Sequence, residues 1–208
     1  MIRSTIFSAA LVFAIGWMPP LAAADAFQIS PQIALEINVT ADSAPGWIPT
    51  ADQRQRAIAT TKSYLDALEA ARYPEAYGLY TSDMKRDMTL AQFTQDEMKF
   101  KSMAGAVKFW RVLKITWTKD PAQAPYPGIY VAIDLASQYA NVDRDCGYFV
   151  LYQASPGDAF AIMRRENNYM DNATALQGEQ KQSKAAVAEA WAALTRYCPN
   201  YVSQPETP

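Results

Sequence analysis

The sequence predicts an α+β fold in which three N-terminal helices pack on a curved four-stranded antiparallel sheet, with an extended arm before them and a C-terminal helix after them. Two observations carry this prediction. Apolar residues recur at helical spacing between residues 52 and 105, and they alternate with polar residues between residues 107 and 165, as strands require. The chain has 208 residues, half of them hydrophobic, which suffices for one core with tails.

The N-terminal segment has the pattern of a secretory signal. Arg3 precedes an apolar run over residues 6–15, and small residues lead to Ala24. A retained membrane anchor is the alternative, but prolines at 19–20 interrupt the run, and a span needs about 20 apolar residues. We therefore expect a signal peptide over residues 1–24 and an exported product, periplasmic or secreted, with no membrane span after cleavage.

Residues 25–51 are predicted to form an extended arm and a linker. Apolar residues alternate from Phe27 to Val39 as in a strand, and Pro31 within this run favours a sheet edge. Trp47 lies in the linker and is expected to pack on the main domain, because a large aromatic side chain gains from burial.

Three helices are predicted to open the main domain, residues 52–170. Pro74 fits the first turn of the second helix. Thr89 and Gln92 form a capping box at the start of the third helix, and Gly105 ends it. The predicted helices cover residues 52–72, 74–81 and 89–105.

Four antiparallel strands are predicted to follow. Arg111 interrupts an otherwise apolar face of the first strand, so it requires either a partner or a pocket. Arg164–Glu166 is interpreted as a solvated strand end, and Asp143–Asp145 as a turn. The predicted strands cover residues 107–117, 129–136, 146–153 and 159–165.

A C-terminal helix and tail are predicted over residues 171–208, with the helix ending near Tyr197. Cys198 shares a helical stripe with Trp191 and therefore faces the side that the helix buries. Cys146 is the second cysteine, and an isolated pair in an oxidising compartment is expected to form a disulfide. Two free thiols are the alternative, but no Cys-x-x-Cys spacing and no histidine is present to activate one.

The composition excludes several function classes. The chain has no histidine, which removes Ser-His-Asp and Cys-His nucleophiles and histidine-rich metal sites. A net charge of -2 gives no basis for nucleic-acid binding. We expect no metal and no cofactor.

The order of elements resembles the nuclear-transport-factor-2-like (cystatin-like) superfamily, in which a curved sheet wraps a long helix into a cone. More narrowly, the chain resembles a family of bacterial exported domains of unknown function, numbered 4019. The resemblance covers residues 52–169, and the sequence departs from the family pattern at Cys146. The residues that carry it are Ser63–Leu68, Tyr73–Tyr77, Phe93 and Tyr126–Ile133.

Enzymes of this superfamily place acids and tyrosines in the mouth of the cone, and the resemblance implies where such residues would lie. Asp134, Tyr130 and Arg111 are the catalytic candidates, and Arg111, Tyr130 and Tyr148 are the pocket candidates. The structural alternatives are a paired arginine near the sheet rim for Arg111, and solvent exposure or a rim salt bridge for Asp134. The superfamily also implies a homodimer, although no residue of the sequence establishes one.

We expect a non-catalytic exported module that binds a small apolar ligand or a protein partner, because the sequence has no coherent acid-base set. A small-molecule isomerase or hydrolase that uses an Asp/Tyr/Arg pocket is the first alternative. A cell-envelope accessory protein is the second, and it would show an exposed apolar patch around Trp47, Trp110 or the outer sheet face.

Overall fold

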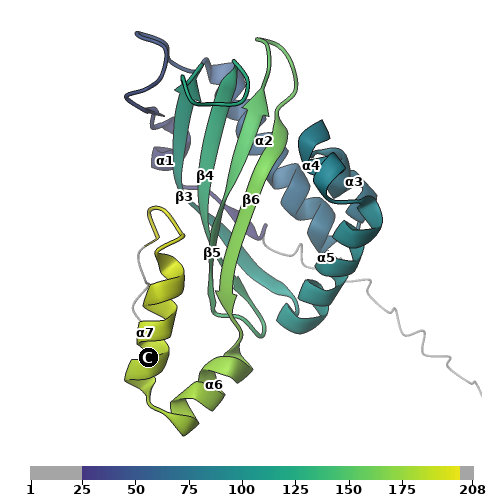
Figure 1. Cartoon of the computed structure of the whole chain (residues 1–208), viewed down its shortest axis with the longest axis vertical. Helices are drawn as coiled ribbons and strands as arrows, with labels where there is room; N and C mark the ends of the chain where they lie inside the picture. Colours follow the sequence, from purple (N-terminus) through teal and green to yellow (C-terminus); the bar gives the residue numbers. More distant parts are fainter. Residues whose placement is uncertain (1–24, 202–208) are drawn as a thin grey trace, which may run out of the picture.

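The computed structural model describes residues 25–201, so the predicted signal peptide over residues 1–24 lies outside the described residues. Within residues 25–201 the chain forms seven helices and a mostly antiparallel six-stranded sheet (Figure 1). The helices are α1 (Pro31–Leu35), α2 (Ala51–Glu69), α3 (Tyr73–Gly78), α4 (Ser82–Asp87), α5 (Leu90–Ala104), α6 (Asn172–Lys181) and α7 (Lys184–Thr195). The strands are β1 (Phe27–Gln28), β2 (Asn38–Val39), β3 (Val107–Lys119), β4 (Ile129–Tyr139), β5 (Arg144–Gln153) and β6 (Ala161–Met170).

The sheet is a meander with two short additions at one edge. Strands β3 to β6 are consecutive antiparallel neighbours, which confirms the predicted α+β class and the pairing of the four long strands. The count of four strands was too low, because β1 and β2 both pair with β3 in parallel. The arm therefore extends the sheet beyond β3.

The arm is not extended throughout, as its alternating pattern had predicted. The Ser30 hydroxyl accepts a hydrogen bond from the Ile33 backbone N–H, and Pro31 occupies the first turn of α1. A capping serine followed by proline starts a helix at no cost in backbone donors, and this local signal overrides the alternation. Trp47 packs against the core, as predicted.

The helices before the sheet also differ in number from the prediction. The segment predicted as one helix over residues 74–81 is α3 alone, and the chain then starts α4 with a new cap at Thr81. Between the two helices, the Thr81 N–H donates to the carbonyl of Ile162, and the Ile162 N–H donates to the carbonyl of Leu79. The break thus attaches the helical layer to the start of β6. The predicted capping box of Thr89 and Gln92 is present.

Helices α2 to α5 cover one face of the sheet, which we call the inner face (Figure 1). Tyr64 of α2 is fully buried there, with its ring centroid 5.4 Å from that of Phe149 in β5. Phe93 of α5 packs against Tyr64 from the helical side. These aromatic contacts join α2, α5 and β5 into one core.

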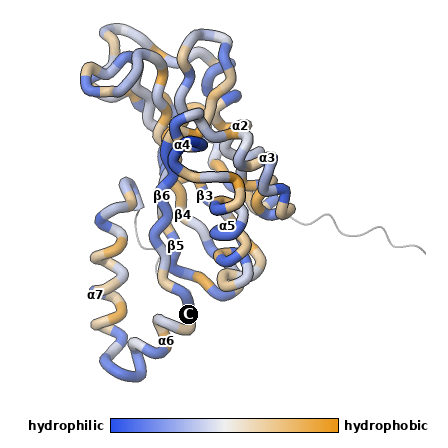
Figure 2. The backbone as a smooth tube through the Cα atoms, turned by 45° about the vertical axis from the view of Figure 1, so that its right-hand side comes forward, coloured by the Kyte–Doolittle hydropathy of each residue, from blue (hydrophilic) through white to orange (hydrophobic). Residues whose placement is uncertain are grey.

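The C-terminal segment lies against the opposite, outer face. It contains two helices instead of the single one predicted, because Ser183 caps a new helix start two residues after α6 ends. Figures 1 and 2 show α7 across the sheet from α2 to α5. Its contact is a small separate core, formed by Cys146, Trp191 and Cys198 with Met170, Leu194 and Tyr201 around them.

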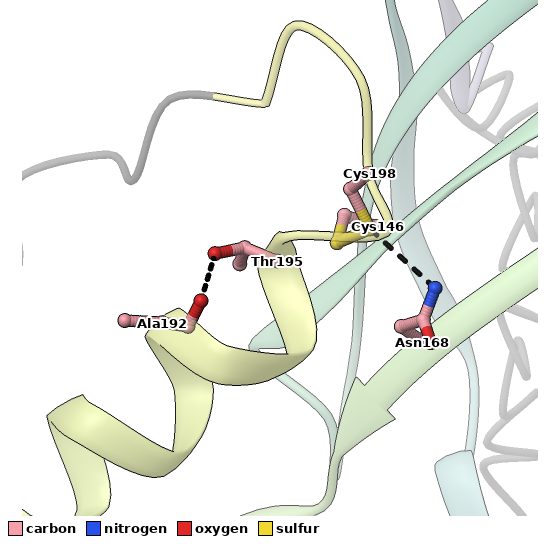
Figure 3. Close-up of a disulfide and its surroundings, with 5 residues drawn as sticks. All are labelled: Cys146, Asn168, Ala192, Thr195 and Cys198. Carbon is pink, nitrogen blue, oxygen red and sulfur yellow. Dashed lines mark hydrogen bonds between the residues drawn. A yellow bond between two sulfur atoms is a disulfide. The ribbon is translucent and has the colours of Figure 1, made fainter.

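Cys146 and Cys198 form the predicted disulfide, with their Cα atoms 5.9 Å apart (Figure 3). The Asn168 side-chain amide lies 3.6 Å from the Cys198 sulfur. The core beneath α7 is small, so apolar packing holds this part of the chain only weakly. The disulfide adds a covalent restraint.

Removal of the disulfide should therefore destabilise the protein. The bond joins residues 52 positions apart, and loss of a loop of this length in the unfolded chain costs about 4 kcal/mol in the chain-entropy model. We expect the Cys146→Ser/Cys198→Ser variant to show that loss in denaturant unfolding of the protein expressed without its predicted signal peptide. Reductant should destabilise the wild type and leave the double variant unchanged; equal effects on both would contradict this account.

Candidate binding site

A cavity of about 450 Å³ lies between α4, α5 and β6, and we call it the α5 cavity. Its lining residues come from α4 and the residues that flank it, from α5 and from β6. Its apolar wall is formed by methionines and aromatic rings: Met84, Met88, Met103, Phe93, Phe100, Tyr80 and Tyr169. Its polar wall is formed by Asp96, Glu97, Lys99, Arg165 and Asn167.

Arg165 is the central polar residue of this cavity. It pairs with Phe149 across β5 and β6, and this register places it on the inner face. Its Nη1 donates to Glu97 Oε1 and to the Tyr64 hydroxyl, the latter at 2.9 Å. The side chains of Arg165 and Glu97 are only 19% and 12% exposed, so this ion pair is largely removed from water.

The surroundings of Arg165 and Tyr64 raise the pKa values of both side chains. Burial lowers the pKa of Arg165, but the nearby Tyr64 and Glu97 more than compensate and hold it well above its usual value. Burial also raises the pKa of Tyr64 well above its usual value, so its phenol stays neutral and bonds the Tyr80 hydroxyl at 2.8 Å. Arg165 therefore stays charged and Tyr64 stays neutral at neutral pH.

Asp145 lies on the same inner face, next to the cavity wall. It pairs with Ser137 of β4 and with Tyr169 of β6, and it is only 2% exposed. Burial raises the pKa of Asp145 to about 6. Hydrogen bonds with the side chains of Ser137 and Asn167 and the positive charge of Arg165 lower this pKa by smaller amounts. Its Oδ2 atom has no hydrogen-bond partner among residues 25–201. A buried carboxylate oxygen without a donor is costly, and its position requires an explanation.

A second cavity of about 430 Å³ lies beside the start of α4, between Tyr126 and Tyr152. The Tyr126 hydroxyl donates to Asp83 at 2.9 Å, which lowers the pKa of that carboxyl. The Tyr126 hydroxyl and the Asp83 carboxylate of this cavity are therefore already hydrogen-bonded to each other. Residues 25–201 contain no group of three or more Cys, Asp or Glu side chains arranged to hold a metal ion.

The structure places the sequence-predicted site residues on the outer face, and they line neither of the two cavities. Two register shifts in β3 alter the alternation expected there, so that Trp110, Val112 and Ile115 face the core. Arg111 instead stacks on Phe109, with its guanidinium carbon 4.6 Å from the ring centroid. The interpretation of Arg111 as a charge on a buried face was wrong for this reason.

The other three predicted residues are only partly brought together. Asp134 and Tyr148 are direct neighbours across β4 and β5. Asp134 is buried and accepts a hydrogen bond from Asn200 of the C-terminal segment. Tyr130 lies farther along β4, where its hydroxyl donates to the Tyr126 carbonyl at 2.6 Å. Asp134 was expected to lie in solvent or in a rim salt bridge if it is not catalytic; instead it is buried, and it makes no salt bridge with the residues that the structure describes.

Sequence reasoning missed Arg165, Glu97 and Asp145 as site residues. The interpretation of Arg164–Glu166 as solvated holds for Arg164, which bonds Glu166 at the surface, but not for Arg165, whose side chain points to the other face. Asp145 was assigned to a turn, although β5 already begins at Arg144. Alternation along β6 could have identified Arg165, because residues 165 and 169 are an even number of positions apart and therefore lie on the same face of the sheet.

The ion pair should show strong coupling in a double-mutant cycle. Glu97→Leu leaves the Arg165 charge uncompensated and should cost about 3 kcal/mol of unfolding free energy. Arg165→Met added to it should restore part of that loss, because the orphaned charge is gone. Denaturant unfolding checks this, with the exposed Arg164→Met as control. Additive effects of the two single changes would contradict a coupled buried pair.

Asp145 should make stability depend on pH. Its pKa is about 6 in the folded state against 3.8 for an ordinary aspartate, so the folded state holds the proton more tightly and stability falls as pH rises between these values. Asp145→Asn should therefore stabilise the protein at pH 8 by up to about 3 kcal/mol and hardly at all at pH 4. Asp143→Asn, exposed and two residues away, should show no such difference. An Asp145→Asn effect that is the same at both pH values would refute the assignment.

Comparisons with known proteins show a similarity to one family over the central part of the chain. A family model described as "Protein of unknown function (DUF4019)" matches residues 60–162. A search of curated proteins gave no match. Among solved structures, "Structure of Bdellovibrio bacteriovorus Bd1075" is similar at 15% identity and a TM-score of 0.35, over 58% of this chain and 42% of that chain. The chain thus spans less than half the length of that protein. From α2 to the first residues of β6, the chain is similar to the DUF4019 proteins of unknown function, as its sequence motifs had indicated.

Proposed function

We propose that the protein is an exported, non-catalytic module that binds a small, mostly apolar molecule in the α5 cavity. The observation that carries this proposal is the cavity itself, about 450 Å³ in volume and walled by methionines and aromatic rings. Small-molecule sites have volumes of roughly 300–1,000 Å³ and combine apolar walls with a few fixed polar groups. The α5 cavity has both properties.

The two kinds of wall would serve different purposes in binding. Met84, Met88 and Met103 have flexible, unbranched side chains, which adapt to ligands of different shape. Arg165 is held by Glu97 and Tyr64, so it presents a fixed polar surface. Apolar contact would supply affinity, and the polar group would orient the molecule.

Export is supported by the disulfide, since such bonds persist in oxidising compartments. None of the described helices combines the length and apolarity needed to cross a membrane. The signal peptide, a periplasmic or secreted location and the wider resemblance to nuclear-transport-factor-2-like proteins remain predictions that fit this proposal, as does a homodimer.

The two alternative functions receive less support. The enzyme hypothesis relied on Asp134, Tyr130 and Arg111, which are distributed over the outer face. The accessory-protein hypothesis expected an exposed apolar patch around Trp47, Trp110 or the outer sheet face, and the structure gives no such patch at the two tryptophans. Trp110 is only 4% exposed, with its indole N–H bonded to the Tyr139 hydroxyl at 3.0 Å, and Trp47 packs on the core.

Filling the cavity should abolish binding of an apolar probe. We expect the mature protein to bind N-phenyl-1-naphthylamine with a rise in probe fluorescence, and Met103→Trp to weaken this binding about tenfold or more. Met98→Trp is the matched control, because Met98 lies on the same helix but is 55% exposed and outside the cavity wall.

Fluorescence titration of the wild type, Met103→Trp and Met98→Trp with this probe tests the proposed cavity. A wild type that fails to bind this probe would contradict the proposal, and so would equal weakening by the two tryptophan variants.

A further inference from the structure

The polar groups around the α5 cavity have an unequal supply of hydrogen-bond donors and acceptors. Arg165 already donates from Nη1 to both Glu97 and Tyr64, so the buried cation has its anion. Asp145 has no ion-pair partner among the described residues: hydrogen bonds with Ser137 and Asn167 reach the carboxyl, but its Oδ2 is buried without a donor there. The buried carboxylate at this end of the inner face therefore lacks a compensating positive charge.

Asp145 is separated from the cavity by one layer of side chains. Its direct neighbour across the strands, Tyr169, lines the cavity, and so does Asn167, which lies close enough to lower the pKa of Asp145. The Phe100 ring packs edge-on against Tyr169 and Tyr139, at centroid distances of 5.1 and 5.3 Å, and closes the layer. A charge in the cavity would interact with Asp145 through a medium of low dielectric constant, where such attraction is strong.

The balance of charge around the cavity is negative when Asp145 is ionised. Arg165 and Lys99 match Glu97 and Asp96 in the cavity wall, and Asp145 adds one further negative charge behind it. This excess is buried, so water and salt screen it poorly. It favours a cationic ligand over an anionic one.

The aromatic wall has the same preference. Phe93, Phe100, Tyr80 and Tyr169 surround the cavity, and the faces of aromatic rings attract cations within about 6 Å of the ring centroid. The fold already uses this interaction next to the cavity, where the Arg165 guanidinium carbon lies 5.5 Å from the Tyr64 ring centroid.

We infer that the molecule held in the α5 cavity is a small amphipathic amine, whose ammonium group lies against Asn167 and Tyr169 in front of Asp145 and whose apolar body lies among the methionines. This inference rests on the proposed binding function and adds the class of ligand.

Binding should then depend on pH through Asp145. Its pKa near 6 means that the carboxylate loses its charge as pH falls from 8 to 5, whereas a primary amine stays protonated over this range. Amine affinity should therefore fall with falling pH. The titratable, charged and polar groups that face Asp145 are Ser137 and Tyr139 of β4, Arg165, Asn167 and Tyr169 of β6, and Tyr201. Of these, Arg165, Tyr139 and Tyr201 have raised pKa values and keep their protons between pH 5 and 8.

The test compares three ligands that share one apolar body: 4-phenylbutylamine, 4-phenylbutanol and 5-phenylpentanoate. Each is titrated as a competitor of N-phenyl-1-naphthylamine on the mature protein at pH 8 and pH 5. We expect the amine to bind about tenfold more tightly than the alcohol at pH 8, the carboxylate to bind most weakly, and the preference for the amine to shrink at pH 5.

Asp145→Asn should remove both the preference for the amine and its pH dependence, while Asp143→Asn should keep both. Unfolding curves of the two variants show that each is folded, and the pH profile of the wild type tests the same point without any substitution. Tighter binding of the carboxylate, or equal binding of all three ligands, would overturn the amine assignment alone. Failure of the naphthylamine probe to bind would overturn the proposed function and this inference together.

Discussion

The Arg165–Glu97 ion pair is the interaction on which the arrangement of the molecule depends. It joins the edge strand β6 to α5, and through the Tyr64 hydroxyl it also reaches α2 in the centre of the core. A buried ion pair costs desolvation energy and contributes little net stability, but it tolerates few geometries. It ties α5 to β6 beside the α5 cavity, whose wall includes both residues.

The second constraint is the path of the chain after the sheet. The disulfide brings the residues after α7 onto the outer face, where Asn200 bonds Asp134. Burial raises the pKa of Asp134, and Asn200 and Lys114 only partly oppose this effect. The outer face is thereby closed at the position where sequence reasoning had looked for a site. The two faces of the sheet thus differ: the α5 cavity lies on the inner face, and the C-terminal segment is attached to the outer face.

Much of the fold was predictable because it follows from local pattern. The four long strands, the capping box at Thr89 and the disulfide all follow from periodicity, cap chemistry and cysteine count. The failures occurred where a local signal competed with periodicity, as at Ser30 and Pro31 in the arm. The site was less predictable, because the two register shifts in β3 change which residues face inward, and alternation alone does not reveal such shifts.

Asp145 lies at a position where the fold does not require a charged side chain. Ionisation of this buried carboxyl opposes folding, as the direction of its pKa shift shows, and its free oxygen gains nothing from a protein donor. An asparagine or serine at the same position of β5 would avoid the cost of burying a negative charge. Residues that oppose stability concentrate where a protein meets its ligand. The carboxylate next to the cavity is therefore better explained by what the cavity holds than by what the sheet needs.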